Sequence, residues 1–143
     1  MDAEALDGLR PLLGLWRTSG HVLERTGGRE ATIAGTDEYE LMEGGRWVIH
    51  RVDVLMGDVR TVALELIGDP DGRGTFAMRA FDASGRYDEM RLAPAGEGVL
   101  LLRGDGVRST LRLAGADAMD ALWERGAGGA WTPWMQMHFE RIR

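Results

Sequence analysis

The sequence predicts an all-β protein: a single antiparallel up-and-down β-barrel of about ten strands, preceded by a short N-terminal helix. The first observation is that 21 of the 143 residues are glycine, often in clusters such as Gly27-Gly28 and Gly44-Gly45. Glycine takes the positive φ angles that tight hairpin turns require. The second is that the segments between the clusters are rich in β-branched, leucine and aromatic residues, as regularly spaced short strands are.

A short helix is expected at residues 3–13. Asp2 is placed to cap its start, and Pro11 should keep it short. Its apolar face is expected to consist of leucines at helical spacing, namely Leu6, Leu9, Leu12 and Leu13. The remainder of the chain contains no comparable helical pattern.

Ten strands are expected after the helix, and together they make residues 1–143 one domain. In chain order they span residues 14–25, 30–43, 46–56, 59–69, 75–82, 86–93, 99–104, 107–114, 118–125 and 130–142. The connections are too short for crossover helices, so neighbours in sequence should pair antiparallel. Closure into a barrel removes exposed strand edges, and a barrel somewhat larger than eight strands can enclose a ligand.

The composition excludes several classes of chemistry. The chain has no cysteine, and all 17 of its basic residues are arginine, which excludes disulfides, thiolate metal sites, Schiff-base chemistry and Walker-type phosphate loops. The net charge of −6 argues against nucleic acid or an anionic membrane as a partner. No signal peptide and no apolar run of about 20 residues is visible, so the cytoplasm is the expected location.

The start of the first strand resembles that of the calycin superfamily, which includes lipocalins, fatty-acid-binding proteins and nitrobindins. Gly14-Leu15-Trp16 is similar to the Gly-x-Trp signature of these barrels. The resemblance implies that Trp16 closes the barrel floor and that an arginine of the last strand, Arg141 or else Arg143, stacks across its indole. A guanidinium over an indole gains a cation–π contact and can donate to nearby carbonyl groups.

The chain also resembles a bacterial family within that superfamily to which no reaction is assigned. The matching pattern contains Gly-x-Trp, Asp37 to Tyr39, Gly44-Gly45-Arg46-Trp47, His50, Arg51, Asp53, Arg79-Ala80-Phe81-Asp82, Gly85, Trp123-Glu124 and residues 131–135. This resemblance spans nearly the whole sequence and supports the fold. It implies no particular activity.

The leading functional interpretation is that the barrel binds a small, mainly apolar ligand in its interior. The residues expected to contact the ligand are Tyr39, Trp47, Arg51, Asp53, Arg79, Trp123, Trp134 and His138. If the strand face of Trp47 and Arg51 is interior, Arg51 would orient an anionic or carbonyl oxygen of the ligand, and Asp53 would hold its guanidinium. The opposite register would place both side chains on the surface and bring His50 inside.

The last strand raises the question of a second subunit. Simple alternation puts Trp131 and Met135 on one face and Trp134 and His138 on the other, provided that Pro133 keeps the register. These tryptophans would form either a pocket wall or core and dimer packing. Several strands carry apolar residues on both faces, which suits a wall covered outside by the helix or by a second copy, so a homodimer is a possible partner.

Two other functions are open. A cofactor-independent cyclase or isomerase would use the same cavity, with Tyr39, Asp53, Arg51 or a histidine as acid and base. In that role Asp37 and Tyr39 share one strand face, whereas Glu38 and Glu40 share the other, which should be the solvated one.

The third function is haem binding. In the nitrobindin-like barrels that the chain resembles, a histidine on the last strand binds haem, and His138 occupies that strand although its neighbours depart from the haem motif. Otherwise no cofactor is expected. His21, His50 and His138 lie on separate strands without a carboxylate spacing that completes a metal site, so no metal is expected.

Overall fold

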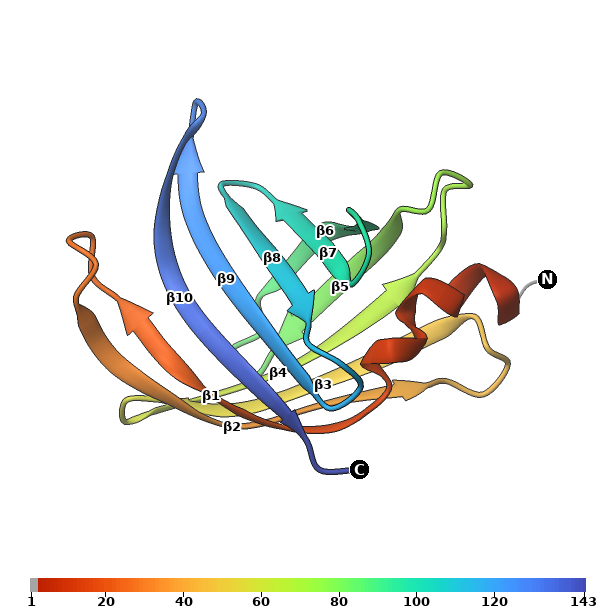
Figure 1. The fold of residues 1–143 in the computed structure, drawn as a ribbon, viewed down its shortest axis with the longest axis horizontal. Helices are drawn as coiled ribbons and strands as arrows, with labels where there is room; N and C mark the ends of the chain where they lie inside the picture. The colour runs from red at the N-terminus through yellow and green to blue at the C-terminus, as the bar shows by residue number, and fades with distance from the viewer. Residues whose placement is uncertain (1–2) are drawn as a thin grey trace.

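The turn-forming glycines and the strands between them build a closed sheet in the computed structural model, which describes residues 3–143 (Figure 1). The strands are β1 (Gly14–Leu23), β2 (Arg29–Leu41), β3 (Trp47–Met56), β4 (Val59–Gly68), β5 (Phe76–Asp82), β6 (Tyr87–Pro94), β7 (Val99–Gly104), β8 (Val107–Leu113), β9 (Ala118–Ala127) and β10 (Ala130–Arg141). Each strand pairs antiparallel with its sequence neighbours, and β1 pairs with β10 to close the ring. The predicted up-and-down barrel of ten strands is confirmed.

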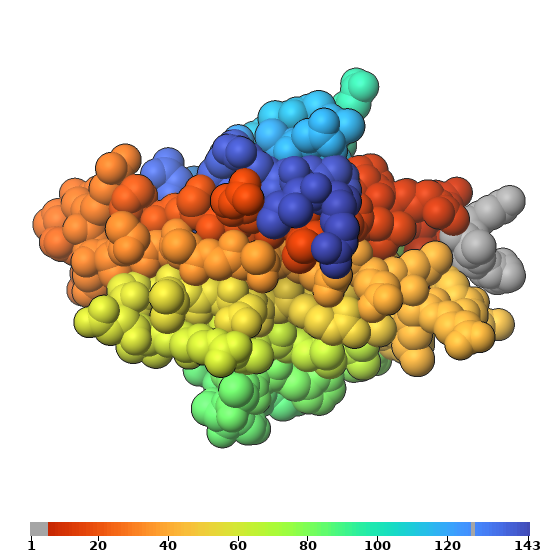
Figure 2. Space-filling view, turned by 90° about the horizontal axis from the view of Figure 1, so that it is seen from below, coloured from red at the N-terminus to blue at the C-terminus, as the bar shows by residue number. Residues whose placement is uncertain are grey.

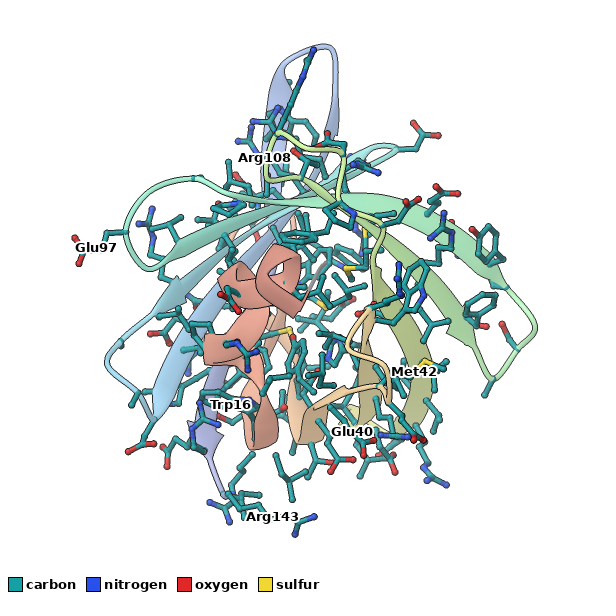
Figure 3. The ribbon with its side chains drawn as sticks, turned by 90° about the vertical axis from the view of Figure 1, so that its right-hand side faces the viewer. Trp16, Glu40, Met42, Glu97, Arg108 and Arg143 are labelled. Atoms are coloured by element: carbon teal, nitrogen blue, oxygen red, sulfur yellow. The ribbon has the colours of Figure 1, made fainter. Side chains whose placement is uncertain are left out.

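The N-terminal helix, η1 (Ala3–Leu12), is a 3₁₀ helix with Pro11 near its end. It lies across one end of the barrel, the end that Figure 3 faces. The predicted leucine face is the buried one, because Leu6, Leu9 and Leu12 are almost fully buried in the main core cluster. Asp2, the expected cap, lies outside the described residues. No helix among residues 3–143 is long and apolar enough to cross a membrane.

Trp16 of β1 and Arg141 of β10 contact each other beside η1, where the first and last strands pair. The Trp16 side chain is fully buried, and its indole nitrogen donates a hydrogen bond to the Leu12 carbonyl at 2.8 Å. The guanidinium carbon of Arg141 lies 4.2 Å from the indole centroid, and Arg141 also donates to the Leu13 carbonyl. The contact implied by the calycin resemblance is therefore present, and Arg141 rather than Arg143 makes it.

Gly14 is required where the chain enters β1. Its φ angle is +134°, and a Cβ at this position would collide with the Arg141 guanidinium and lie 2.5 Å from the Arg143 carbonyl oxygen. Figure 2 shows the C-terminal residues, in dark blue, lying directly against the start of the barrel wall. The glycine of the Gly-x-Trp motif thus makes room for the arginine that covers the tryptophan.

A bulge in β10 changes which tryptophans face inward. The pairing with β9 shifts register between Pro133 and Met135, where proline has no N–H to donate to the ladder. The extra residue inverts the alternation. Trp134 consequently packs on the interior side with Met135, whereas Trp131 lies outside beneath Arg108. The prediction that Trp131 shares the face of Met135 is wrong for this reason.

Apolar side chains also lie on the outer wall over β3, β4 and β5. Leu64 and Phe81 are exposed there, next to the half-buried Val62 and Leu66. Because η1 packs into the barrel end, it does not account for these outward apolar residues. A second copy of the chain on this wall stays a prediction.

We expect Trp16→Ala to lower the free energy of unfolding by about 3–5 kcal/mol, as other large-to-small core substitutions do. The loss combines the buried indole with its contacts to Arg141 and η1. Urea denaturation measures it. Trp131→Ala is the matched control, because that indole also lies beneath an arginine, at 4.3 Å, but is only half-buried. Equal losses in the two variants would contradict a special role of Trp16 in joining β1 to β10 and η1.

Candidate functional site

The barrel interior contains a cavity of about 200 Å³. Leu12 of η1 closes one end of it, and most of its wall is apolar, including Ile67, Met78, Leu111, Trp123, Met137 and Phe139. The polar residues of the wall are fewer: Asp37, Tyr39, His50, Thr61, Glu65 and Ser109. The cavity is thus an apolar space with a small number of built-in polar groups, which is the usual composition of a small-molecule site.

Three ionisable side chains on adjacent strands form the polar core of this wall. His50 of β3 lies between Asp37 of β2 and Glu65 of β4, and all three are buried. The His50 Nε2 atom is 2.6 Å from Asp37 Oδ2, and its Nδ1 atom contacts Glu65 Oε1. Asp37 Oδ1 accepts a hydrogen bond from the Thr18 hydroxyl. Both ring nitrogens and both Asp37 oxygens are therefore engaged.

The two carboxylates keep His50 protonated. Burial by itself lowers the pKa of His50, but the charges and hydrogen bonds of Glu65 and Asp37 outweigh burial and raise the pKa from 6.5 to about 10. The ring is consequently an imidazolium at neutral pH, with an N–H directed at each carboxylate. Such a ring has no lone pair to accept a proton, so His50 holds the two carboxylates in place and does not act as a base.

Tyr39 covers the imidazolium. Its ring stacks on His50 with centroids 3.9 Å apart and planes 10° apart, a geometry that favours a cation over an aromatic face. Burial, with added repulsion from Asp37 and Glu65, raises the pKa of Tyr39 well above its usual value. The side chain is therefore a neutral phenol. Its hydroxyl has no hydrogen-bond partner among the described residues. The residue lines the cavity and is only 8% exposed.

Glu65 provides another unengaged polar atom. Its Oε1 contacts His50, whereas its Oε2 makes no hydrogen bond to a described residue. The side chain lines the cavity and is buried at 9% exposure. A carboxylate oxygen and a phenol hydroxyl without hydrogen-bond partners among the described residues therefore belong to side chains of the cavity wall, and leaving such groups unpaired is costly.

Arg51 and Asp53 do not belong to this site. In β3 the even-numbered residues face the interior and the odd-numbered residues face out, so Arg51 and Asp53 are exposed. Arg51 pairs with Glu40 at 2.8 Å, and Asp53 forms a double hydrogen bond with Arg60. The prediction that Arg51 faces the cavity and pairs with Asp53 is wrong, because the register that places His50 inside is the one adopted.

Three further predicted contacts lie on the outer wall for the same reason of alternation. Trp47 stacks beneath Arg79 at 5.3 Å, and Arg79 also pairs with an exposed aspartate. His138 is directed outward from β10, where its Nδ1 is 2.8 Å from Asp120 Oδ1. None of Trp47, Arg79 and His138 lines the cavity.

Tyr39 and Trp123 are the predicted contact residues that line the cavity. Trp134 stands behind Trp123, edge to face at 6.3 Å, and beneath the guanidinium of Arg125 at 3.9 Å. It supports the cavity wall without lining it. The roles of Tyr39 and Trp123 toward a ligand stay predictions.

Asp37, His50 and Glu65 were not among the predicted ligand contacts. The sequence singles out Asp37 only as an acid or base on the face of Tyr39. The structure places that face inside, and Glu38 and Glu40 lie on the outer face as expected. Glu65 carried a detectable pattern: it is the one charged residue on a face shared with Ala63 and Ile67. A carboxylate on an otherwise apolar strand face points to a buried partner.

A larger hollow of about 650 Å³ lies outside the barrel over β1, β10, β9 and β8. Its polar lining includes His21, Arg112, Asp120, Gln136 and His138. These groups sit on an open wall, where water screens their charges, and His138 is already paired with Asp120. The buried, unpaired groups of the interior make the cavity the stronger candidate.

Neither His138 nor His50 is placed to ligate a group in the cavity. His138 faces outward and cannot reach a group inside the barrel. His50 is interior, but ligating iron through either nitrogen would break an ion pair with a buried carboxylate. Among residues with described side chains, no group of three or more histidine, aspartate and glutamate residues is arranged to hold a metal ion.

Comparisons with known proteins identify the architecture and no activity. No protein-family model matches the chain, and no curated protein matches it significantly. Among solved structures, the crystal structure of Rv2717c from M. tuberculosis is similar, with a TM-score of 0.74 and 15% sequence identity over 98% of each chain. At that identity the similarity shows the fold alone.

The raised pKa of His50 predicts a specific pH dependence of stability. Below pH 6.5 the imidazole is protonated in both folded and unfolded states, and its stabilising contribution is complete. As the pH rises from 6.5 towards about 10, the unfolded state releases its proton first and the contribution is lost. We expect the free energy of unfolding in urea to fall by about 1 kcal/mol per pH unit over this range.

Few other side chains titrate between pH 6.5 and 10, since the chain has no cysteine or lysine and only two tyrosines. His138→Gln is the control, because the bond to Asp120 also raises the pKa of His138 but that group is exposed. The slope should persist in His138→Gln and disappear in His50→Gln. Nitrogen NMR of wild-type protein at pH 8 should show both His50 nitrogens protonated, and a neutral ring would contradict the assignment.

Proposed function

We propose that the barrel binds a small, mainly apolar molecule reversibly in its interior cavity. The observation that carries this proposal is the apolar cavity whose wall holds polar groups without hydrogen-bond partners among the described residues, Tyr39 Oη and Glu65 Oε2 among them. In the core of a filled structural barrel, polar groups of this kind normally have a hydrogen-bond partner. A bound molecule with one polar end would satisfy them and cover the apolar wall at the same time.

The dimensions of the cavity restrict the ligand. At about 200 Å³ the cavity is smaller than the roughly 300–1,000 Å³ typical of sites for drug-sized molecules. Trp123, Phe139 and the methionines Met78 and Met137 provide an apolar wall, and methionine adapts readily to irregular shapes. A single small ring or a short branched chain is the size of molecule that this space suits.

The closed barrel, the Gly-x-Trp entry and the arginine stacked on its tryptophan support assignment to the calycin-like barrels. Interior ligand binding is the general function that this resemblance implies. The assignment rests on fold and on these residues, Gly14, Trp16 and Arg141.

A cofactor-independent proton-transfer enzyme is the second candidate. Glu65 Oε2 is a carboxylate oxygen without a protein partner, and Tyr39 is a phenol that stays protonated. Together they supply the types of group that act as base and acid in isomerisation. Arg51 and Asp53, which were also considered for this role, are excluded by their position on the outer wall. Binding without conversion of the bound molecule would separate the two candidates.

Filling the cavity should abolish binding. Ala63 lines the cavity from β4, and Ala63→Leu adds volume where a ligand would lie. We expect this variant to weaken binding of benzyl alcohol at least tenfold. The measurement is a titration followed by the carbon-13 methyl signals of the methionines, in which Met78 and Met137 should shift and the exposed Met42 should not.

Ala34→Leu is the matched control for this substitution. Ala34 lies on the exposed outer face of β2, so the same change in volume should leave binding unaltered. If wild-type protein shows no saturable shift of the cavity methionines, or if Ala63→Leu binds benzyl alcohol as well as Ala34→Leu does, interior binding is wrong.

A further inference from the structure

We infer that the cavity selects ligands whose polar end is a hydrogen-bond donor, best a protonated amine, and rejects carboxylates. This inference rests on the proposed function and specifies its ligand class. It reverses the polarity expected from the sequence, in which an arginine was to receive an anion. Three features of the cavity wall support it: the balance of charge, the free acceptor on Glu65, and the lack of an arginine among the described residues of the wall.

The balance of charge in the cavity wall is negative. Asp37 and Glu65 bring two carboxylates, and His50 brings one imidazolium. No arginine lines the cavity among the described residues, and the chain has no lysine. A ligand carboxylate would therefore enter an apolar space next to a surplus negative charge, where Coulomb repulsion is weakly screened.

Within the buried ion cluster of Asp37, His50 and Glu65, the free hydrogen-bonding capacity is that of an acceptor. Both oxygens of Asp37 are used, by Thr18 and His50, whereas Glu65 uses only Oε1. Glu65 Oε2 can receive a hydrogen bond but cannot donate one while ionised. A charged hydrogen bond from an ammonium group would both satisfy this oxygen and neutralise the surplus charge.

Tyr39 adds a second acceptor. Its side chain lines the same cavity, its hydroxyl has no partner among the described residues, and the charge of Glu65 acts on it. A phenol oxygen retains lone pairs that can accept a second N–H of an amine. A primary ammonium, which has three donors and no acceptor, matches this pair of groups better than a carboxylate, which has acceptors only.

The fixed geometry of the cluster favours selectivity. His50 is held by an ion pair on each nitrogen and by the stacked Tyr39 ring, so the Glu65 carboxylate cannot swing away without losing its cation. Acceptors that are positioned before the ligand arrives lose little entropy on binding. The same rigidity keeps both His50 N–H groups on the carboxylates, so neither of them can turn towards an anionic ligand.

The test compares four molecules with one ring and different polar ends: benzylamine, benzyl alcohol, toluene and benzoate. Titrations of wild-type protein at pH 7, followed by the methionine methyl signals, should rank benzylamine first, then benzyl alcohol, then toluene, with benzoate weakest. Benzylamine should exceed benzoate by at least about tenfold, the lower end expected for a hydrogen bond to a charged group.

Glu65→Gln removes the charge and preserves the shape of the side chain. It should reduce benzylamine affinity at least about tenfold and leave toluene nearly unchanged. The matched control is Glu40→Gln, because Glu40 is exposed on the outer face of β2 and pairs with Arg51. That variant should keep the wild-type ranking. Circular dichroism checks that both variants fold, and the wild-type ranking tests the inference even if Glu65→Gln does not.

The possible failures are distinguishable. If benzoate binds wild-type protein as tightly as benzylamine, the inferred selectivity is wrong while interior binding stands. The same conclusion follows if a folded Glu65→Gln variant binds benzylamine as the wild type does. If none of the four molecules shifts the cavity methionines, interior binding itself is wrong, and the inference falls with it.

Discussion

The antiparallel pairing of β1 with β10 is the contact on which the rest of this structure depends. It turns a row of hairpins into a ring, so that every strand has two partners and every second side chain faces the barrel interior. Trp16 and Arg141 hold this junction from the inside, and Gly14 leaves the space for them. Because Trp16 and Arg141 also donate hydrogen bonds to the carbonyls of Leu12 and Leu13, they fix the end of η1 that closes the cavity.

Closure makes a polar interior possible at the centre of a mainly apolar barrel. His50 of β3 pairs directly with Tyr39 of β2 and Glu65 of β4, and Asp37 lies two residues from Tyr39 on the same inward face. Asp37 and Glu65, which are 28 positions apart in the sequence, are thus brought together. Both carboxylates contact the His50 imidazole, and the Tyr39 ring stacks on it. A continuous hydrogen-bonded group thus forms from residues that no local motif connects.

The barrel could be predicted from the sequence because hairpins are local: glycine turns and strand periods leave few ways to connect ten strands. The site could not, because a period of two does not say which face is interior when both faces are partly apolar. The polar run of β3 illustrates this, since Arg51 and His50 fit opposite registers equally well. At Trp134 a bulge even inverted the alternation, and a bulge depends on pairing that sequence periodicity does not contain.

The buried cluster is poorly explained by stability alone. Removing charges from water is costly, and apolar residues of similar volume often stabilise a core as well as or better than a buried ion pair does. Asp37, His50 and Glu65 nevertheless occupy the inner wall in place of such residues, and one carboxylate oxygen of Glu65 has no hydrogen-bond partner among the described residues. A structural core would benefit from closing that gap with an aliphatic side chain. A site that must recognise the polar end of a small molecule needs the oxygen free, held in place and surrounded by apolar wall, and this is the arrangement the barrel provides.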